Sequence, residues 1–194
     1  ILTIAFVLVL GLVICTGAMN VFNFMDGING ITGGYSLIVL SAILFILDKN
    51  TLLGQSRAVE PVVSLLKIVL SAALVFCFFN FRSRAKCFAG DVGSVSIAFI
   101  ILFSLGFIVV NTGNLSWLSF LVVYGVDGCL TILHRLMLHE NISQPHRKHL
   151  FQIMANELKV PHVIVSAVYM AVQLLCCIWY ILYPGYLTLF CQII

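Results

Sequence analysis

Charged residues are scarce in this chain, which has 194 residues and only 9% Asp, Glu, Lys and Arg against 62% hydrophobic residues. Soluble domains carry roughly 25% charged residues, so the composition excludes a soluble globular protein. The apolar runs also lack the alternating period of a barrel strand. Because backbone amides find no water in hydrocarbon, the spanning segments must then be helices. The absences together predict an integral membrane protein.

Two further absences narrow the class. The seven cysteines have no C-x-x-C spacing, and most of them stand in apolar runs, so we expect neither a disulfide framework nor a cysteine metal site. The chain opens on Ile1 inside an apolar run, without an initiator Met, a basic region or a cleavage site. We therefore expect it to be an internal, C-terminal portion of a longer protein.

Six apolar runs have the length of a membrane-spanning helix. A hydrocarbon core of about 30 Å requires about 20 helical residues at 1.5 Å each. The sequence predicts an all-α polytopic membrane helix bundle, forming one integral membrane domain over 1–194; a seventh span could begin within 186–194. The six expected spans are 2–19, 31–47, 61–80, 93–110, 117–133 and 161–183.

Basic residues gather in the loops on one side of these spans, whereas only Lys49 and Arg57 fall in loops on the other side. The positive-inside rule then predicts three cytoplasmic segments, 20–30, 81–92 and 134–160. These are the segments in which the polar motifs lie. We expect a multi-pass protein of the bacterial cytoplasmic membrane whose motifs all face the cytosol.

The first motif is a row of polar side chains at the end of a span. Asn20, Asn23 and Asp26 recur every three residues, which places their oxygens along one side of a helix end. Such a row is costly at a membrane boundary unless it binds something. Amide and carboxylate oxygens suit Mg²⁺ or a polar ligand. The structural alternative is a tight turn, because Asp26 and Asn29 each precede a glycine.

The second motif, Phe88-Ala-Gly-Asp91-Val-Gly-Ser94, precedes another span. Its glycines allow a ligand close to the backbone, Asp91 offers a carboxylate, and the helix start offers unpaired amides. The ring of Phe88 could stack on a nucleobase. The structural alternatives are an N-cap formed by Asp91 or Ser94 and simple interfacial packing of Phe88.

The third motif is basic: His146 and His149 flank Arg147 and Lys148. Arginine presents a planar fork to phosphate oxygens, and imidazoles add donors, so the segment favours an anion site. Zinc is disfavoured because the adjacent cations would repel the metal. A basic loop that contacts acidic lipid heads is the structural alternative.

One acid, Asp127, lies inside an expected span, and an intramembrane acid is a functional candidate. It supports an alternative function, a proton-coupled membrane transporter with Asp127 in its path. Structurally, it could instead pair with Arg135 or satisfy polar groups in the bundle. The polar residues cluster in loops and not at the midplane where carriers bind, which favours an enzyme.

Together the motifs supply ligands for Mg²⁺, cations for a diphosphate and an aromatic ring for a base, which is the set that phosphoryl transfer requires. Their forms, N-x-x-N-x-x-D-G-x-N-G, F-x-G-D-x-G-S and H-R-x-H, in this order, resemble the polyprenyl-phosphate N-acetylhexosamine-1-phosphate transferases. The closest resemblance is to the branch that initiates O-antigen or capsule repeats.

The resemblance implies transfer of a sugar 1-phosphate from a UDP-N-acetylhexosamine to undecaprenyl phosphate, with release of UMP and formation of a lipid-linked diphosphosugar. It implies Mg²⁺, or Mn²⁺, as cofactor, membrane lipids and a possible second copy as further partners, and no nucleic acid. Metal ligation would fall to Asp91 and Asn23 and catalytic roles to Asp91, Asn23, Asp26 and His149; substrate binding would involve Phe88, Asn29, Asn20, His146, Arg147 and Lys148.

Two departures from the family pattern are visible. Many members carry Asp where this chain has Asn29, which predicts altered contacts and not loss of activity. The adjacent Asp pair that the family places in an earlier cytoplasmic loop is not among these residues. We therefore expect the site in this chain to be incomplete and the chain alone to be inactive.

Overall fold

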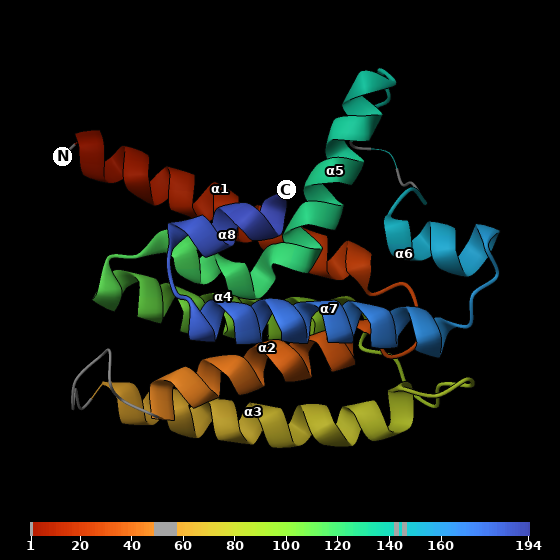
Figure 1. Cartoon of the computed structure of the whole chain (residues 1–194), viewed down its shortest axis with the longest axis horizontal. Helices are drawn as coiled ribbons and strands as arrows, with labels where there is room; N and C mark the ends of the chain where they lie inside the picture. The colour runs from red at the N-terminus through yellow and green to blue at the C-terminus, as the bar shows by residue number, and fades with distance from the viewer. Residues whose placement is uncertain (1, 49–57, 142–143, 145–146) are drawn as a thin grey trace.

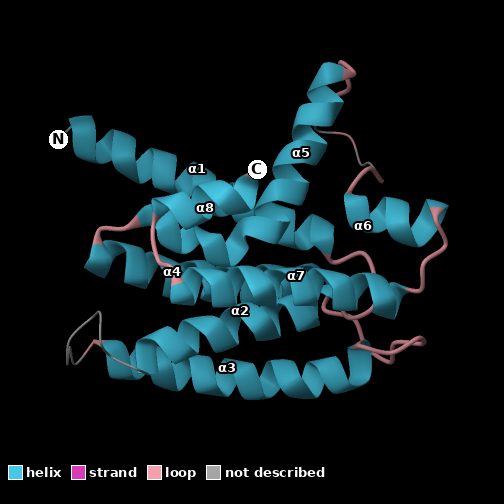
Figure 2. Ribbon diagram, viewed as in Figure 1, coloured by secondary structure: helices cyan, strands magenta, loops and turns pink. Residues whose placement is uncertain are grey.

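The computed structural model describes residues 2–48, 58–141, 144 and 147–194, so His146 of the third motif lies outside the described residues. The described part contains helices and no strand (Figure 2). In chain order they are α1 Leu2–Met25, α2 Ile31–Asp48, α3 Val59–Asn80, α4 Gly90–Thr112, the 3-10 helix η1 Leu115–Leu121, α5 Val122–Met137, α6 Leu150–Gln152, the π-helix η2 Ile153–Glu157, α7 His162–Leu182 and α8 Tyr186–Ile193.

Six of these segments are long and apolar enough to cross a membrane, α5 being counted together with η1. The predicted all-α polytopic membrane bundle is therefore confirmed. Helix α1 continues to Met25, beyond its expected end at 19, and α4 begins at Gly90, before its expected start at 93. The expected loop 20–30 thus starts only after Met25, and Asn20 and Asn23 lie in the last turns of α1. The expected start of a seventh span is α8, whose eight residues are too few to span a bilayer.

Helix α2 is the centre of the bundle and lies between α3 and α7 (Figure 1). Its burial is the greatest among the spans, with 61% of its residues buried, against 11% for the span of α1. Two adjacent glycines allow its neighbours to approach. A Cβ on Gly33 would lie 2.7 Å from Sγ of Cys77 in α3, and one on Gly34 would lie 2.3 Å from Sδ of Met170 in α7. Small residues serve the same purpose at membrane helix contacts in general.

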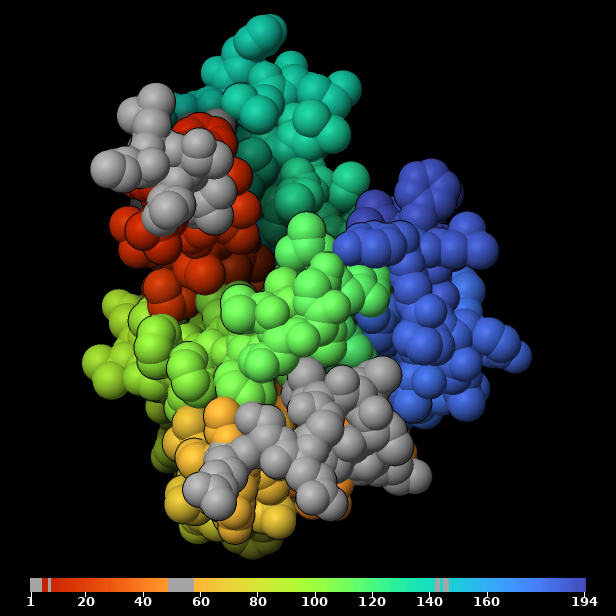
Figure 3. Space-filling model, turned by 90° about the vertical axis from the view of Figure 1, so that its left-hand side faces the viewer, coloured from red at the N-terminus to blue at the C-terminus, as the bar shows by residue number. Residues whose placement is uncertain are grey.

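The fifth span is not the single straight helix that the run 117–133 predicts. It is broken into η1 and α5, and α5 tilts away from the bundle in Figure 1 and stands beside α1 above the other helices in Figure 3. A break frees backbone groups that need partners in lipid. Gln173 of α7 supplies them: its Oε1 accepts from the Val123 N–H at 3.2 Å, and its Nε2 donates to the Ser119 carbonyl at 3.3 Å.

The first two motifs and the start of α7 lie at one end of the bundle. The Gly30 N–H donates to Oδ1 of Asn80 at the end of α3 (2.7 Å), and the Ser166 hydroxyl of α7 donates to the Asn29 carbonyl (2.8 Å). The C-terminal ends of α2 and α4 lie at the opposite end in Figure 1. The convergence expected from alternating spans is therefore present within the described residues.

The sidedness of these two ends is a testable prediction. In the complete protein without its native cysteines, Asn111→Cys should react with a membrane-impermeant maleimide on intact cells. Ser83→Cys should react only after the membrane is opened, because the basic loops keep its end in the cytosol. Both side chains are exposed, so accessibility within the protein does not bias the comparison. The reverse labelling would place the motifs outside the cell.

Candidate active site at the motif end of the bundle

The first and second motifs meet where α1 ends and α4 begins. Oδ1 of Asn23 accepts a hydrogen bond from the Ser94 hydroxyl at 2.8 Å, and Ser94 is fully buried. The N-cap alternative for this motif is wrong, because the N-cap residue of α4 is Ala89, which makes no side-chain cap bond. Asp91, in the first turn of α4, is exposed. An amide oxygen has two lone pairs, so Asn23 retains the capacity for a further ligand.

Asp26 follows α1 directly and faces the same junction. Burial raises the pKa of Asp26 above its ordinary value of 3.8, and the nearby negative charge of Asp91 raises it further. The nearby polar groups of Thr32 and the Gly90 backbone lower the pKa of Asp26 and so act in the opposite direction. Burial is the main cause of the shift, and the charge of Asp91 makes a smaller contribution in the same direction. The two acids belong to the place where two of the three polar motifs meet.

A divalent cation suits this arrangement. Mg²⁺ prefers oxygen ligands and takes one or two protein carboxylates, leaving the other positions to substrate phosphates and water. Asp26 and Asp91 supply the carboxylates and Asn23 an amide oxygen, and a bound cation would offset the repulsion between the two acids. The residues fit the implied Mg²⁺. A group of three or more His, Cys, Asp or Glu side chains that could hold a metal ion does not occur among the described residues, so the ligand set here would be two carboxylates and an amide oxygen completed by substrate and water.

The pKa of Asp26 gives a prediction for stability. A raised folded-state pKa means that the native protein binds the proton more tightly than the unfolded chain, so stability falls as pH rises above 3.8 and through the folded pKa. Without divalent cations, Asp26→Asn should therefore raise the midpoint of thermal unfolding at pH 7. The gain should shrink as the pH is lowered toward 4. Equal midpoints at pH 7 would show that the ionised acid is not destabilising.

An asparagine that the sequence analysis missed holds the second motif in place. Asn80, 5% exposed at the end of α3, accepts from the Gly30 N–H through Oδ1 and donates through Nδ2 to the Cys87 carbonyl at 2.7 Å. It thus joins the first motif to the residue before Phe88. The available signal was a polar residue at the end of an otherwise apolar run. Gly30 has a φ of +87°, and a Cβ there would lie 2.1 Å from the Phe81 ring.

The Asn29 side chain, to which the resemblance assigns substrate binding, forms hydrogen bonds with a neighbouring loop. Its Nδ2 donates to the carbonyl oxygens of Arg82 at 2.9 Å and Ser83 at 3.2 Å. A carboxylate could not make these bonds, because it is an acceptor only. The contacts give a physical reason for Asn at a position where the family often has Asp. Its role toward a nucleotide stays a prediction.

Asn29→Asp should accordingly destabilise the protein although it restores the commoner residue. The new carboxylate would face two carbonyl oxygens, and we expect a loss of about 1–3 kcal/mol in the free energy of unfolding, the scale of a part-buried polar group without its partner. Thermal unfolding at pH 7 measures it. Asn20→Asp is the matched control, because Asn20 is exposed in α1 and should tolerate the change. Equal losses of stability in the two variants would show that the bonds from Asn29 to the loop carbonyls do not stabilise the protein.

The third motif reaches the same end through the segment that follows it. Phe151 of α6 is fully buried against the first motif, since a Cβ on Gly27 would lie 2.9 Å from Cε2 of its ring. His149 is 3% exposed and stacks on Phe151, with 5.8 Å between the ring centroids and 24° between their planes. The chain forms the short helices α6 and η2 directly after the motif. All three motifs therefore contribute residues to one end of the bundle.

The cations of the third motif differ in their surroundings. Arg147 is exposed, whereas Lys148 forms an ion pair with Glu140, and this hydrogen bond lowers the pKa of Glu140. Arg135, at the end of α5, is buried and donates to Oε2 of Glu140 at 3.3 Å and to the Asn141 carbonyl at 2.6 Å. Glu140 thus links the end of α5 to the basic segment. Arg147 is the motif cation most accessible to a ligand among the described residues.

Asp127 is held by polar neighbours and not by the suggested ion pair with Arg135. Its Oδ2 accepts from the Tyr169 hydroxyl at 2.8 Å, and its Oδ1 accepts from the Leu150 N–H at 3.1 Å. The second structural interpretation, that Asp127 satisfies polar groups within the bundle, is confirmed.

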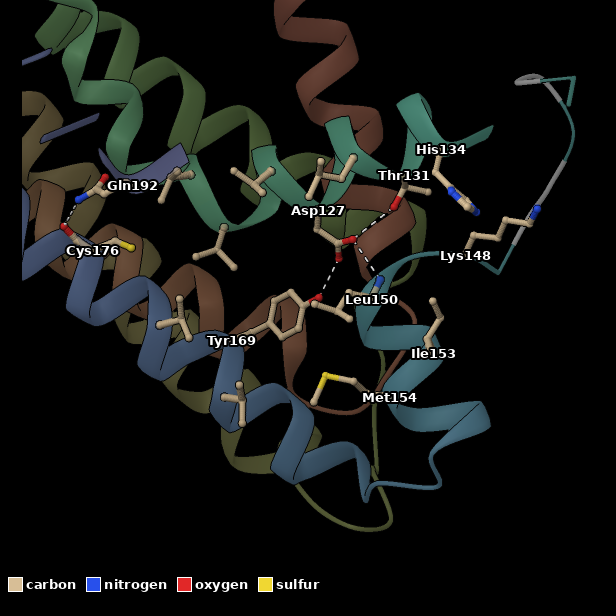
Figure 4. Close-up of a pocket in the computed structure, with 16 residues that line it drawn as sticks. Asp127, Thr131, His134, Lys148, Leu150, Ile153, Met154, Tyr169, Cys176 and Gln192 are labelled. Atoms are coloured by element: carbon tan, nitrogen blue, oxygen red, sulfur yellow. Dashed lines mark hydrogen bonds between the residues drawn. The ribbon is translucent and has the colours of Figure 1, made fainter. Parts of the chain in front are cut away.

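A pocket of about 530 Å³ lies between α5, the α6–η2 segment and α7 (Figure 4). Its wall is mostly aliphatic, and polar side chains stand toward the end near the third motif. Neither Asp26 nor Asp91 lines it, so it neighbours their junction without including it. The polar lining residues near the third motif are Asp127, Thr131, His134 and Lys148.

Comparison with known proteins identifies the family. The model of glycosyl transferase family 4 matches residues 1–110, which include the first two motifs. The chain belongs to this family. The resemblance that the motifs indicated is thereby confirmed.

Three relatives illustrate the match. The probable undecaprenyl-phosphate N-acetylglucosaminyl 1-phosphate transferase of Bacillus subtilis (strain 168) is 30% identical over 138 residues, covering 69% of this chain and 36% of the relative. The phospho-N-acetylmuramoyl-pentapeptide-transferase of Paenarthrobacter aurescens is 40% identical over 106 residues, covering 48% and 28%. That of Deinococcus radiodurans is 36% identical over 96 residues, covering 50% and 23%. The chain thus spans about a third or less of the length of these relatives.

Proposed function

We propose that this chain is part of an enzyme that transfers an N-acetylhexosamine 1-phosphate from a UDP-sugar to undecaprenyl phosphate, releasing UMP and leaving a lipid-linked diphosphosugar. The observation that carries the proposal is the junction of the first two motifs, where Oδ1 of Asn23 accepts from the Ser94 hydroxyl at 2.8 Å. Asp26 and Asp91 both belong to this junction, which lies at the end of a membrane bundle to which the basic motif also comes. The names of the relatives support it, since they act on undecaprenyl phosphate or transfer a phospho-sugar.

The residues have distinct roles in this reaction. Bound Mg²⁺ would neutralise charge on the diphosphate. The ion would be held by Asp91 together with Asn23 and Asp26. Arg147 offers a fork of donors to the phosphate oxygens, and Lys148 adds a second cation. Phe88, 72% exposed just before α4, has a ring face available for stacking on uracil. Binding both substrates in one orientation supplies most of the catalysis that phosphoryl transfer requires.

The acceptor lipid explains why such a site would lie at a membrane surface. We assign the polyprenyl chain to the aliphatic pocket between α5 and α7, with its phosphate near Lys148 and His134 at the polar side. Lipid and sugar donor would then meet at the cytosolic face of the bacterial cytoplasmic membrane. The product would initiate a cell-surface polysaccharide, O-antigen or capsule by resemblance of the motifs. The acid pair expected from the family would come from the rest of the enzyme.

Asp91→Asn in the complete enzyme tests the proposal. Removing a carboxylate that stabilises transition-state charge should lower kcat by about 10²–10³-fold or more, the scale of losing one such group. The assay measures UMP release and lipid-linked product from UDP-GlcNAc, UDP-GalNAc and UDP-6-deoxy-N-acetylhexosamines, with undecaprenyl phosphate and with or without Mg²⁺. Glu60→Gln, an exposed acid in the first turn of α3, is the matched control and should be fully active.

Two outcomes would contradict the assignment. Wild-type turnover by Asp91→Asn, still dependent on Mg²⁺, would remove Asp91 as a ligand. Absence of UMP release by the wild-type enzyme with every sugar, together with proton-coupled solute uptake, would support the transporter instead. The bonds at Asp127 argue against that outcome, because Tyr169 and the Leu150 N–H already engage its two oxygens.

A further inference from the structure

Asp127 connects two spans and the third motif through one carboxylate. The residue is 8% exposed in α5. Its Oδ2 accepts from the Tyr169 hydroxyl of α7 at 2.8 Å (Figure 4). Its Oδ1 lies 3.1 Å from the Leu150 N, 3.3 Å from the Thr131 hydroxyl and 3.5 Å from Nδ1 of His149. Oδ2 of Asp127 therefore bonds to a neighbouring span, and Oδ1 contacts the segment that carries the third motif.

The contacts on the motif side fix both the backbone and the ring of one residue. The Leu150 amide belongs to the peptide bond that follows His149, so its bond to Asp127 holds the main chain at that point. The imidazole is held separately, because Nδ1 lies 3.3 Å from Oγ1 of Thr131 and 3.5 Å from Asp127. With 3% of its surface exposed and Phe151 stacked on it, the ring has little freedom. Its orientation is set by α5.

A purely structural role does not require this arrangement. Burying a carboxylate among membrane helices is costly, and the cost is offset only by several hydrogen bonds. Joining α5 to α7 needs only the bond from Tyr169. The additional bonds at Oδ1 all go to Thr131, one turn along α5, and to the segment that carries His149. The carboxylate of Asp127 therefore contacts the segment of the third motif in addition to the bundle.

We propose that Asp127 is a positioning residue that acts through His149. It holds the imidazole and the adjoining peptide at the motif end of the bundle, in the orientation that transfer of the sugar phosphate requires. The proposal rests on the proposed function, because the resemblance of its motif gave His149 a catalytic role. It also concerns a physical constraint that is measurable without turnover.

A double-mutant cycle with His149→Ala tests the proposal in the complete enzyme. Asp127→Asn alone should lower kcat at least tenfold while the KM for the UDP-sugar changes less than threefold. In the His149→Ala background, the same substitution should change kcat less than twofold, because the group through which Asp127 acts is gone. Equal losses in both backgrounds would overturn the proposal, since they would show that Asp127 acts independently of His149.

Matched variants separate positioning from folding. Asp48→Asn removes an exposed acid at the opposite end of α2 and should leave kcat unchanged. Tyr169→Phe removes the bond to Oδ2 but keeps those at Oδ1, so it should lower the thermal midpoint with a smaller loss of kcat than Asp127→Asn. A loss of kcat as large as that of Asp127→Asn would favour a structural role. Should Asp127→Asn fail to fold, Thr131→Val, which deletes the hydroxyl beside Nδ1, takes its place in the cycle.

Hydrogen exchange supplies the readout that does not depend on activity. Asp127→Ala, which removes both acceptor oxygens, should accelerate exchange of the amides of 149–153, Leu150 above all, by at least tenfold, with the amides of α4 unchanged. Unchanged exchange at Leu150 would overturn the proposal. In a third outcome, the substitution accelerates exchange in this segment while the wild-type enzyme makes no lipid-linked product from any UDP-sugar. That pair of results would support the positioning role and contradict the proposed function. The two failures are therefore distinguishable.

Discussion

Polar groups within hydrocarbon have no water to bind, and the structure depends on meeting this requirement wherever a helix breaks or ends inside the bundle. Gln173 of α7 binds backbone groups on both sides of the break in the fifth span. Asn80 binds the turn before α2 and the loop before α4. Asp127 binds the peptide at the start of α6. In each case a side chain from a packed helix satisfies backbone from another segment, so the contact that removes an energetic penalty also fixes the position of a loop.

The convergence of the motifs follows from these contacts. Once Asn80 joins Gly30 to Cys87, the residues that follow each of them are brought to one end of the bundle. The buried ring of Phe151 against Gly27 adds the third motif. Loops are usually the most mobile parts of a protein, yet a site for phosphoryl transfer requires groups held in fixed positions. Here a few buried hydrogen bonds hold the loops in fixed positions relative to the helices.

Sequence reasoning recovered the six spans because a run of about 20 apolar residues rarely occurs outside a membrane-spanning helix. It singled out the motif residues for the complementary reason, since Asn, Asp and Arg at a membrane boundary are costly without a purpose, and their roles stay predictions. It missed the break at Leu121 because neither Gly nor Pro stands in 115–124 to mark it, and the side chain that permits the break, Gln173, lies far along the chain. The suggested partner for Asp127 was wrong for a similar reason. Arg135 is near in sequence, whereas Tyr169 and Leu150 are brought close only by the fold.

The acids at this end of the bundle are in opposite physical situations. Asp127 is surrounded by donors, so its charge is satisfied by the protein itself. Asp26 is partly buried beside Asp91, and the pKa of Asp26 is raised because its charged form lacks full compensation. A carboxylate that the protein satisfies can hold other groups in place, whereas one left under-compensated gains most from an incoming cation. Asp127 therefore supports the fold, whereas the ionised form of Asp26 destabilises it. A ligand that brings positive charge would bind more tightly at the second place because the protein has not already neutralised it.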